Sequence, residues 1–281
     1  MVIQTAYTQP CITLLFSEPE LHLPSALQLA MDFSSVEGSP HPENIEVNVQ
    51  LQQSDKLAAE LVLLEHHIKI LGAGMQLPKD VMARCLQAAH WQGNFKSMLA
   101  SHKSQMVLSY SGPSKTPLEK MMMLYKTAYA LRHESLIGIV NENAWTAHPV
   151  LDTLEPARIR SYRESIPFLL WFGYLKIPLT ETLSFLATKG HGVFNMPELA
   201  FLLEAGEDSS AVLNTFFNVF YYMLGNHGAV KAGDTLEVSG ANEYLRFNAM
   251  PDLPGLEQWR INPEATLMLE RIQPGEVENN K

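Results

Sequence analysis

The chain has 281 residues, of which 46% are hydrophobic and 18% charged, so it can bury a substantial core and is not a disordered protein. Its 20 basic and 30 acidic residues give a net charge of −10, which argues against nucleic acid as a partner because phosphates are neutralised by basic residues. Two distant cysteines exclude a disulfide framework, and no apolar run is long enough for a signal peptide or a membrane span, so we expect a cytoplasmic protein.

Strands and helices alternate in the first half of the sequence. The apolar run over residues 11–16 predicts a strand, and residues 24–33 suit an amphipathic helix. Apolar and polar side chains alternate over residues 44–51 with the period of two that indicates a half-buried strand. Residues 57–77 predict one or two strands, and a helix should begin after Pro78.

The clearest helix start follows a strand predicted over residues 105–110. Thr116 suits an N-cap, Pro117 suits the first helical position, and Glu119 completes the pattern of a capping box. We therefore predict a helix from Pro117 to about Leu131. Residues 136–140 should then form another buried strand.

Residues 141–165 show no clean period and contain two prolines, Pro149 and Pro156, which is typical of a domain boundary. The sequence predicts two domains joined by a connector and followed by a frayed end. Their ranges are an N-terminal α/β domain over 1–145, a connector over 146–165, a C-terminal α+β domain over 166–272 and a tail over 273–281.

The C-terminal domain should contain the longest helix of the chain. Residues 168–176 and 182–188 predict two strands, and residues 195–198 resemble a helix start. The long helix should run from Ser209 or Ser210 to Leu224. Its apolar positions cover a wide face, so we expect the helix to be largely buried. A strand-rich segment follows. The predicted fold class is α/β (α+β), with helices packed on mixed β-sheets in two sub-domains.

The sequence contains no local pattern of a catalytic or metal-binding site. A phosphate-binding loop needs glycine before its lysine, but Ser114 precedes Lys115. None of the ten histidines forms a pair four positions apart around a glutamate, and Cys-x-x-Cys and Gly-x-Ser-x-Gly are both absent. Histidines near element ends, such as His102 and His133, should meet backbone groups or water. We therefore expect no catalytic residue, no cofactor and no metal ligand.

The acidic residues are concentrated in the second half of the chain. Residues 141–281 carry a net charge of −8 and residues 1–140 only −2. Glu204, Glu207 and Asp208 form the tightest acidic group, and they precede the long helix, whose N-terminal dipole accounts for negative charge there. They are also the best candidates for binding a basic partner.

Three sequence features resemble a known family. Thr188-Lys189-Gly190, Pro197-Glu198 and Gly233-Asp234-Thr235 occur in an order that resembles the bacterial family catalogued as domain of unknown function 4261. The resemblance spans most of the chain and is specific over about residues 180–240. It implies turn and helix-start roles for Gly233-Asp234-Thr235 and Pro197-Glu198, but no chemistry. In size and acidity such families resemble cytoplasmic immunity proteins that act against type VI secreted toxins.

Three functional hypotheses follow. The first is a non-enzymatic immunity protein that neutralises a basic antibacterial toxin, such as a nuclease, by occluding it. The second is a hydrolase or small-molecule enzyme whose site combines residues distant in sequence. The third is a structural or adaptor subunit, which a homo-oligomer would favour. An exposed acidic or apolar patch would favour the binder, and a deep pocket with convergent polar groups would favour the enzyme.

Overall fold

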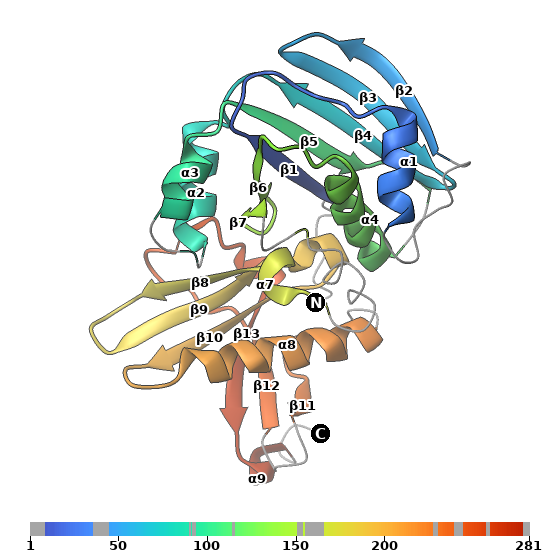
Figure 1. The fold of residues 1–281 in the computed structure, drawn as a ribbon. Coiled ribbons are helices and arrows are strands. Elements are labelled where there is room, and N and C mark those ends of the chain that lie inside the picture. The colour runs from blue at the N-terminus through green and yellow to red at the C-terminus, as the bar shows by residue number, and fades with distance from the viewer. Residues whose placement is uncertain are drawn as a thin grey trace. The chain divides into compact units, whose positions relative to one another are not determined.

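The computed structural model describes two units of the chain, Gln9–Gly173 and Tyr174–Lys281 (Figure 1). Their strands and helices define an α+β fold, which confirms the predicted fold class. The first unit contains an antiparallel sheet and the second a mixed one. The described residues are 9–35, 45–89, 91, 94–113, 116–150, 154, 166–226, 230–238, 244–256 and 259–277.

The sheet of the first unit has seven strands in the order β2-β3-β4-β5-β1-β6-β7. The strands are β1 (Cys11–Phe16), β2 (Ile45–Gln52), β3 (Lys56–Leu63), β4 (His66–Ala73), β5 (Ser104–Tyr110), β6 (Leu136–Asn141) and β7 (Thr146–Pro149). Strand β7 pairs with β6, so the sheet extends into the range expected to be a connector. The two units divide between Gly173 and Tyr174, later in the chain than the sequence predicts.

Helices α1 (Ala26–Ser34) and α4 (Pro117–Ala130) pack together beside β1, β2 and β5. Alternation along the strands places Leu14, Leu61 and Leu108 on one face of the sheet, and all three are fully buried. The capping box of α4 is present at Thr116, as predicted. This helix is buried at every position from Met121 to Ala130, so its three consecutive methionines all lie in the core.

Helices α2 (Lys79–Ala88) and α3 (Asn94–Ala100) pack against β6 and β7. Leu15, which points away from the Leu14 face, joins an apolar cluster with Cys85 of α2, Leu99 of α3 and Val140 of β6. The sheet of this unit is therefore covered on parts of both faces.

The sheet of the second unit has the order β11-β12-β13-β10-β9-β8. Its strands are β8 (Gly173–Pro178), β9 (Leu183–Lys189), β10 (Glu198–Glu204), β11 (Thr235–Glu237), β12 (Tyr244–Ala249) and β13 (Thr266–Ile272). The predicted long helix is α8 (Ser209–Gly225), and it packs on β10 (Figure 1). It is buried on one face rather than over most of its surface, because its opposite side is exposed. The ring of its Phe216 stacks on that of Tyr174, with the ring centroids 6.5 Å apart. The ring centroids of its Phe220 and of His191 are 5.2 Å apart. No helix within the described ranges is long and apolar enough to span a membrane.

Four local predictions differ from the structure. Residues 195–198 do not start a helix, because Asn195 is left-handed at φ 58° after the short helix η3 (His191–Phe194), and β10 follows. Residues 168–176 begin as helix α7 (Phe168–Trp171) before β8. Strand β2 lies at the sheet edge, so its side chains are largely exposed rather than half-buried. The predicted tail contains helix α9 (Pro274–Val277), and residues 278–281 lie outside the described ranges.

Candidate functional site

The predicted partner-binding residues lie where strand β10 leads into helix α8. Glu204 ends the strand, Glu207 and Asp208 occupy the following loop, and all three are exposed. Gly206 makes the turn between them at φ 93°, a left-handed conformation that glycine adopts without steric cost. Asp208 is the N-cap of α8, because its carboxylate accepts a hydrogen bond from the Ser210 amide at 2.9 Å.

Glu207 holds the loop in place through both carboxylate oxygens. One oxygen accepts the backbone amide of Glu204 at 2.7 Å, and the other lies 3.1 Å from the Arg271 guanidinium. That guanidinium also lies 4.9 Å from the centre of the Phe201 ring. Glu207 and Asp208 therefore stabilise the fold locally as well as contributing negative charge.

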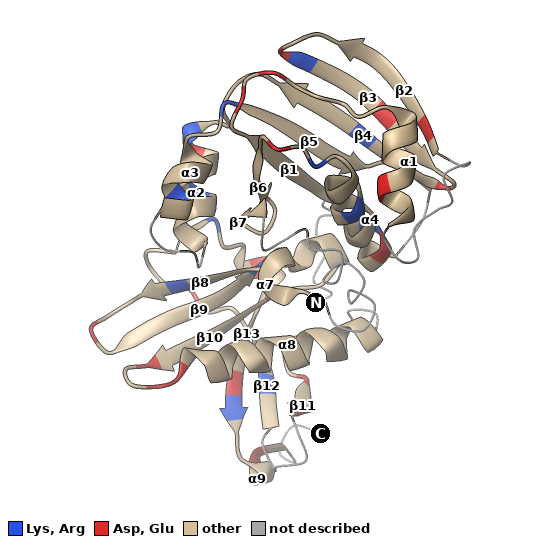
Figure 2. Ribbon diagram, in the orientation of Figure 1, with Lys and Arg blue, Asp and Glu red and all other residues tan. Residues whose placement is uncertain are grey.

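Strand pairing adds a fourth carboxylate to this group. Glu204 lies opposite Leu183 in the sheet, and the Ala205 amide donates to the Thr182 carbonyl at 2.8 Å. The exposed Glu181, in the turn between β8 and β9, is therefore at the same end of the sheet (Figure 2). We call Glu181, Glu204, Glu207 and Asp208 the acidic edge. Glu181 is 23 positions from Glu204, and only the strand pairing relates them.

The residues that carry the family resemblance lie in two separate hydrogen-bonded turns. Glu198 accepts the Thr188 hydroxyl at 2.7 Å, the Gly190 amide at 2.8 Å and the His191 amide at 3.1 Å. Pro197-Glu198 is thus the start of a strand and not of a helix. In Lys231–Asp234 the aspartate accepts the Lys231 amide at 3.0 Å, which fits the predicted turn.

Two buried histidines contact backbone groups, and a buried cysteine lies in a surrounding that keeps its thiol protonated. His102 accepts the Leu77 amide, and the ring of His191 lies 3.0 Å from the Pro197 carbonyl, so both meet backbone groups as predicted. Burial raises the pKa of the Cys85 thiol to about 12, and the charge of Glu142 adds to this effect. Since the thiolate is the nucleophilic form, Cys85 is unreactive at neutral pH.

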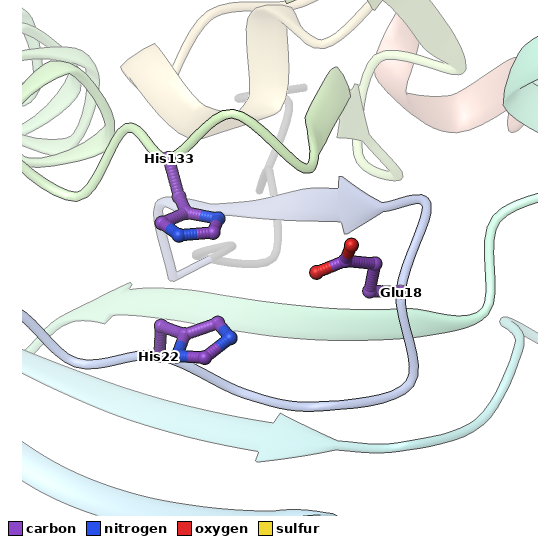
Figure 3. A group of neighbouring side chains, drawn as sticks. All are labelled: Glu18, His22 and His133. Atoms are coloured by element: carbon purple, nitrogen blue, oxygen red, sulfur yellow. The ribbon is translucent and has the colours of Figure 1, made fainter.

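The first unit contains a group of polar side chains that the sequence pattern did not reveal. One ligand-type atom from each of Glu18, His22 and His133 lies within 4.8 Å of the others. Figure 3 shows the Glu18 carboxylate and the two imidazole rings gathered at one place. The rings are stacked, with centroids 4.6 Å apart and planes inclined by 22°. Only tertiary structure brings His133 to this loop, so local spacing gave no signal.

A pocket of about 340 Å³ adjoins the two histidines. Its wall includes Asp32 of α1 and Arg132, which form an ion pair of 2.7 Å. Arg132 is fixed further, because it donates to the Tyr129 carbonyl at 2.8 Å and lies 3.9 Å from the centre of the Tyr129 ring. The wall of the pocket therefore carries a well-anchored ion pair.

Comparisons of the chain with protein-family models, curated proteins and solved structures gave no match. The resemblance to the family of unknown function 4261 and the immunity role that it implies stay proposals.

Proposed function

We propose that this chain is a non-enzymatic, cytoplasmic protein-binding protein, an immunity protein that occludes a basic toxin delivered by type VI secretion. The observation that carries the proposal is the acidic edge, where four exposed carboxylates, from the β8–β9 turn, the end of β10 and the loop after it, lie at one end of a sheet. Arg271, bound to Glu207, offsets one of these charges.

Rigid placement of the charges supports a binding role. Asp208 and Glu207 are held by backbone hydrogen bonds, so their side chains lose little conformational freedom on meeting a partner. Negative charge complementary to a basic surface speeds diffusional encounter and fixes the orientation of the complex. A toxin that acts on nucleic acid has such a basic surface.

The direct test uses the proteins encoded beside the gene for this chain. Each neighbour is expressed in a bacterial host with and without this chain, and survival and co-purification are measured. We expect one neighbour to be toxic alone, harmless with the chain and bound to it. Absence of any toxic or bound neighbour counts against an immunity role.

The structure also determines which variants test the acidic edge. Glu181→Lys with Glu204→Lys reverses two exposed charges, while Asp208→Asn removes a third charge and keeps a side chain suited to N-capping. We expect these changes to slow association with the toxin, and to reduce the fall of the association rate with rising salt. Binding kinetics at two ionic strengths measure both effects.

The matched control is Glu20→Lys with Glu46→Lys, two exposed residues of the first unit. These substitutions change the net charge by the same amount as the pair at positions 181 and 204. They should leave the attraction between the acidic edge and the toxin in place. If the control slows association as much as the test variant, overall charge and not the acidic edge governs binding.

A second candidate function is a small-molecule enzyme with a site assembled from distant residues. The pocket beside His22 and His133, with the Asp32–Arg132 ion pair in its wall, favours this alternative. Co-purification in the co-expression assay separates the two candidates, because occlusion of a toxin requires binding whereas an enzyme need not bind it.

A further inference from the structure

We propose that Glu18, His22 and His133 bind one divalent transition-metal ion of the zinc class. Glu18 and His22 belong to the loop between β1 and α1, and His133 belongs to the loop between α4 and β6. All three lie in the first unit, whereas the acidic edge lies in the second. The metal site is thus independent of the proposed toxin-binding function.

Hydrogen bonds between the two loops hold Glu18 beside His133. The Ser17 amide donates to the Ser135 carbonyl at 2.8 Å, which joins the residue before Glu18 to the loop that carries His133. The Glu18 carbonyl accepts the Ser104 hydroxyl at 2.6 Å. The backbone of the carboxylate ligand is therefore fixed, while its exposed side chain stays able to rotate.

The backbone beside each histidine is also anchored. Leu21 is 6% exposed and its amide donates to the Ser54 carbonyl at 3.0 Å, so the residue before His22 is held in the core. The Leu136 amide donates to the His133 carbonyl at 2.9 Å and closes the second loop. Such anchoring lowers the entropy that ion binding would otherwise cost.

Ser135 orients the His133 ring. Its hydroxyl oxygen lies 2.8 Å from Nδ1, and its amide donates to the same atom at 3.2 Å. Coordination through Nε2 places the ring proton on Nδ1, where the hydroxyl oxygen accepts it and the longer amide contact is given up. An outer hydrogen bond of this kind commonly orients a metal-binding histidine.

The ligand set selects the class of ion. Two imidazole nitrogens and one carboxylate oxygen suit Zn²⁺ and Co²⁺, whereas Mg²⁺ and Ca²⁺ require mainly oxygen ligands. Tetrahedral zinc bonds of about 2.0–2.1 Å place neighbouring ligand atoms about 3.4 Å apart. In the present structure the three ligand atoms lie within 4.8 Å of one another. Rotation of the exposed Glu18 and His22 side chains brings them to the shorter separation.

The surroundings accept a cation and a further ligand. Asp32 pairs with Arg132 at 2.7 Å, which offsets the positive charge next to His133. The pocket of about 340 Å³ beside the two histidines has room for a water molecule as fourth ligand. The site therefore resembles open zinc sites, in which three protein ligands leave one position for water.

Calorimetric titration of the untagged full chain with Zn²⁺ tests the site, with Mg²⁺ and Ca²⁺ titrated in parallel. We expect one Zn²⁺ per chain and no comparable binding of the other two ions. His22→Ala and Glu18→Gln should each weaken Zn²⁺ binding at least about 10- to 100-fold, the loss typical of even outer partners of metal ligands. Co²⁺ should give a visible absorption spectrum that disappears in both variants.

Two matched controls identify the ligands. Glu20→Gln changes an exposed carboxylate in the same loop, and His67→Ala removes a partly exposed imidazole outside the group, so neither should alter Zn²⁺ binding. Circular dichroism confirms folding, and the nearly isosteric Glu18→Gln decides the result if His22→Ala alters the spectrum. Zn²⁺ binding that is absent below about 1 mM, or equal in wild type and both ligand variants, overturns the proposal.

Discussion

At the scale of single residues, buried histidines link stability to pH. His102 is 1% exposed; its Nε2 accepts the Leu77 amide at 2.8 Å, and its Nδ1 lies 2.7 Å from the Leu99 carbonyl. These partners require a neutral ring with its proton on Nδ1. Burial lowers the pKa of His102 below its usual value of 6.5, and the Leu99 hydrogen bond opposes this in part. Burial likewise lowers the pKa of His191.

We predict that the free energy of unfolding decreases as pH falls below about 6.5. In that range the unfolded chain binds protons at both histidines while the folded chain resists them, so acid favours unfolding. Urea unfolding at pH 7.5 and pH 5.5 measures the difference. His102→Gln should lower stability at pH 7.5 and reduce the dependence on pH, because one of the two groups is gone.

The control for this prediction is His67→Gln, because His67 has a partly exposed side chain 3.5 Å from Glu60. Its substitution should leave most of the pH dependence in place. If the free energy of unfolding of His102→Gln changes with pH as much as that of the wild type, His102 does not contribute to the pH dependence.

At the scale of elements, helix α8 organises the core of the second unit. Its buried residues Val212, Phe216, Val219, Phe220 and Met223 recur at helical spacing on one face. Phe216 and Phe220 contact Tyr174 of β8 and His191 of η3, so one helix joins two parts of the unit. Asp208 at the N-cap fixes where this helix begins.

Phe216→Ala should lower the free energy of unfolding by about 3–5 kcal/mol, because Phe216 is only 1% exposed and its removal leaves a cavity. Denaturant unfolding followed by circular dichroism measures the loss. Tyr222→Ala, at a position of the same helix that is 41% exposed, should change stability by no more than about 0.5 kcal/mol. Equal effects of the two substitutions would contradict the burial of the Phe216 face.

At the scale of the whole molecule, each unit has an apolar core of its own. In the first unit Leu14, Leu61 and Phe33 are fully buried, and in the second Phe185 and Phe220 are. Apolar burial is the main source of folding free energy, and the proposed metal ligands lie outside these cores. Folding should therefore not depend on a metal ion, even though an ion can bind the folded chain.

We predict that chelator-treated protein keeps its far-ultraviolet circular dichroism and unfolds cooperatively on heating. Added Zn²⁺ should then raise the thermal unfolding midpoint of the wild type more than that of Glu18→Gln, because the folded variant binds the ion more weakly. Loss of the cooperative transition after chelation would mean that the ion is part of the folding core.

The sequence by itself determined the features that depend on neighbouring residues. Thr116, Pro117 and Glu119 defined the start of α4 because N-capping involves positions within one turn of the helix. Aromatic residues at helical spacing likewise defined α8 and its buried face. The acidic residues at 204, 207 and 208 were found because they are close in the chain.

Only the tertiary structure decided which distant residues meet. Strand pairing between β9 and β10 placed Glu181 at the end of the sheet that carries Glu204, and the contact between Ser17 and Ser135 brought Glu18 and His22 to His133. The exposure of β2 also depends on its place at the sheet edge. A local pattern reports which face of an element is apolar, but the element's neighbours decide whether that face is covered, and no short-range signal encodes their order.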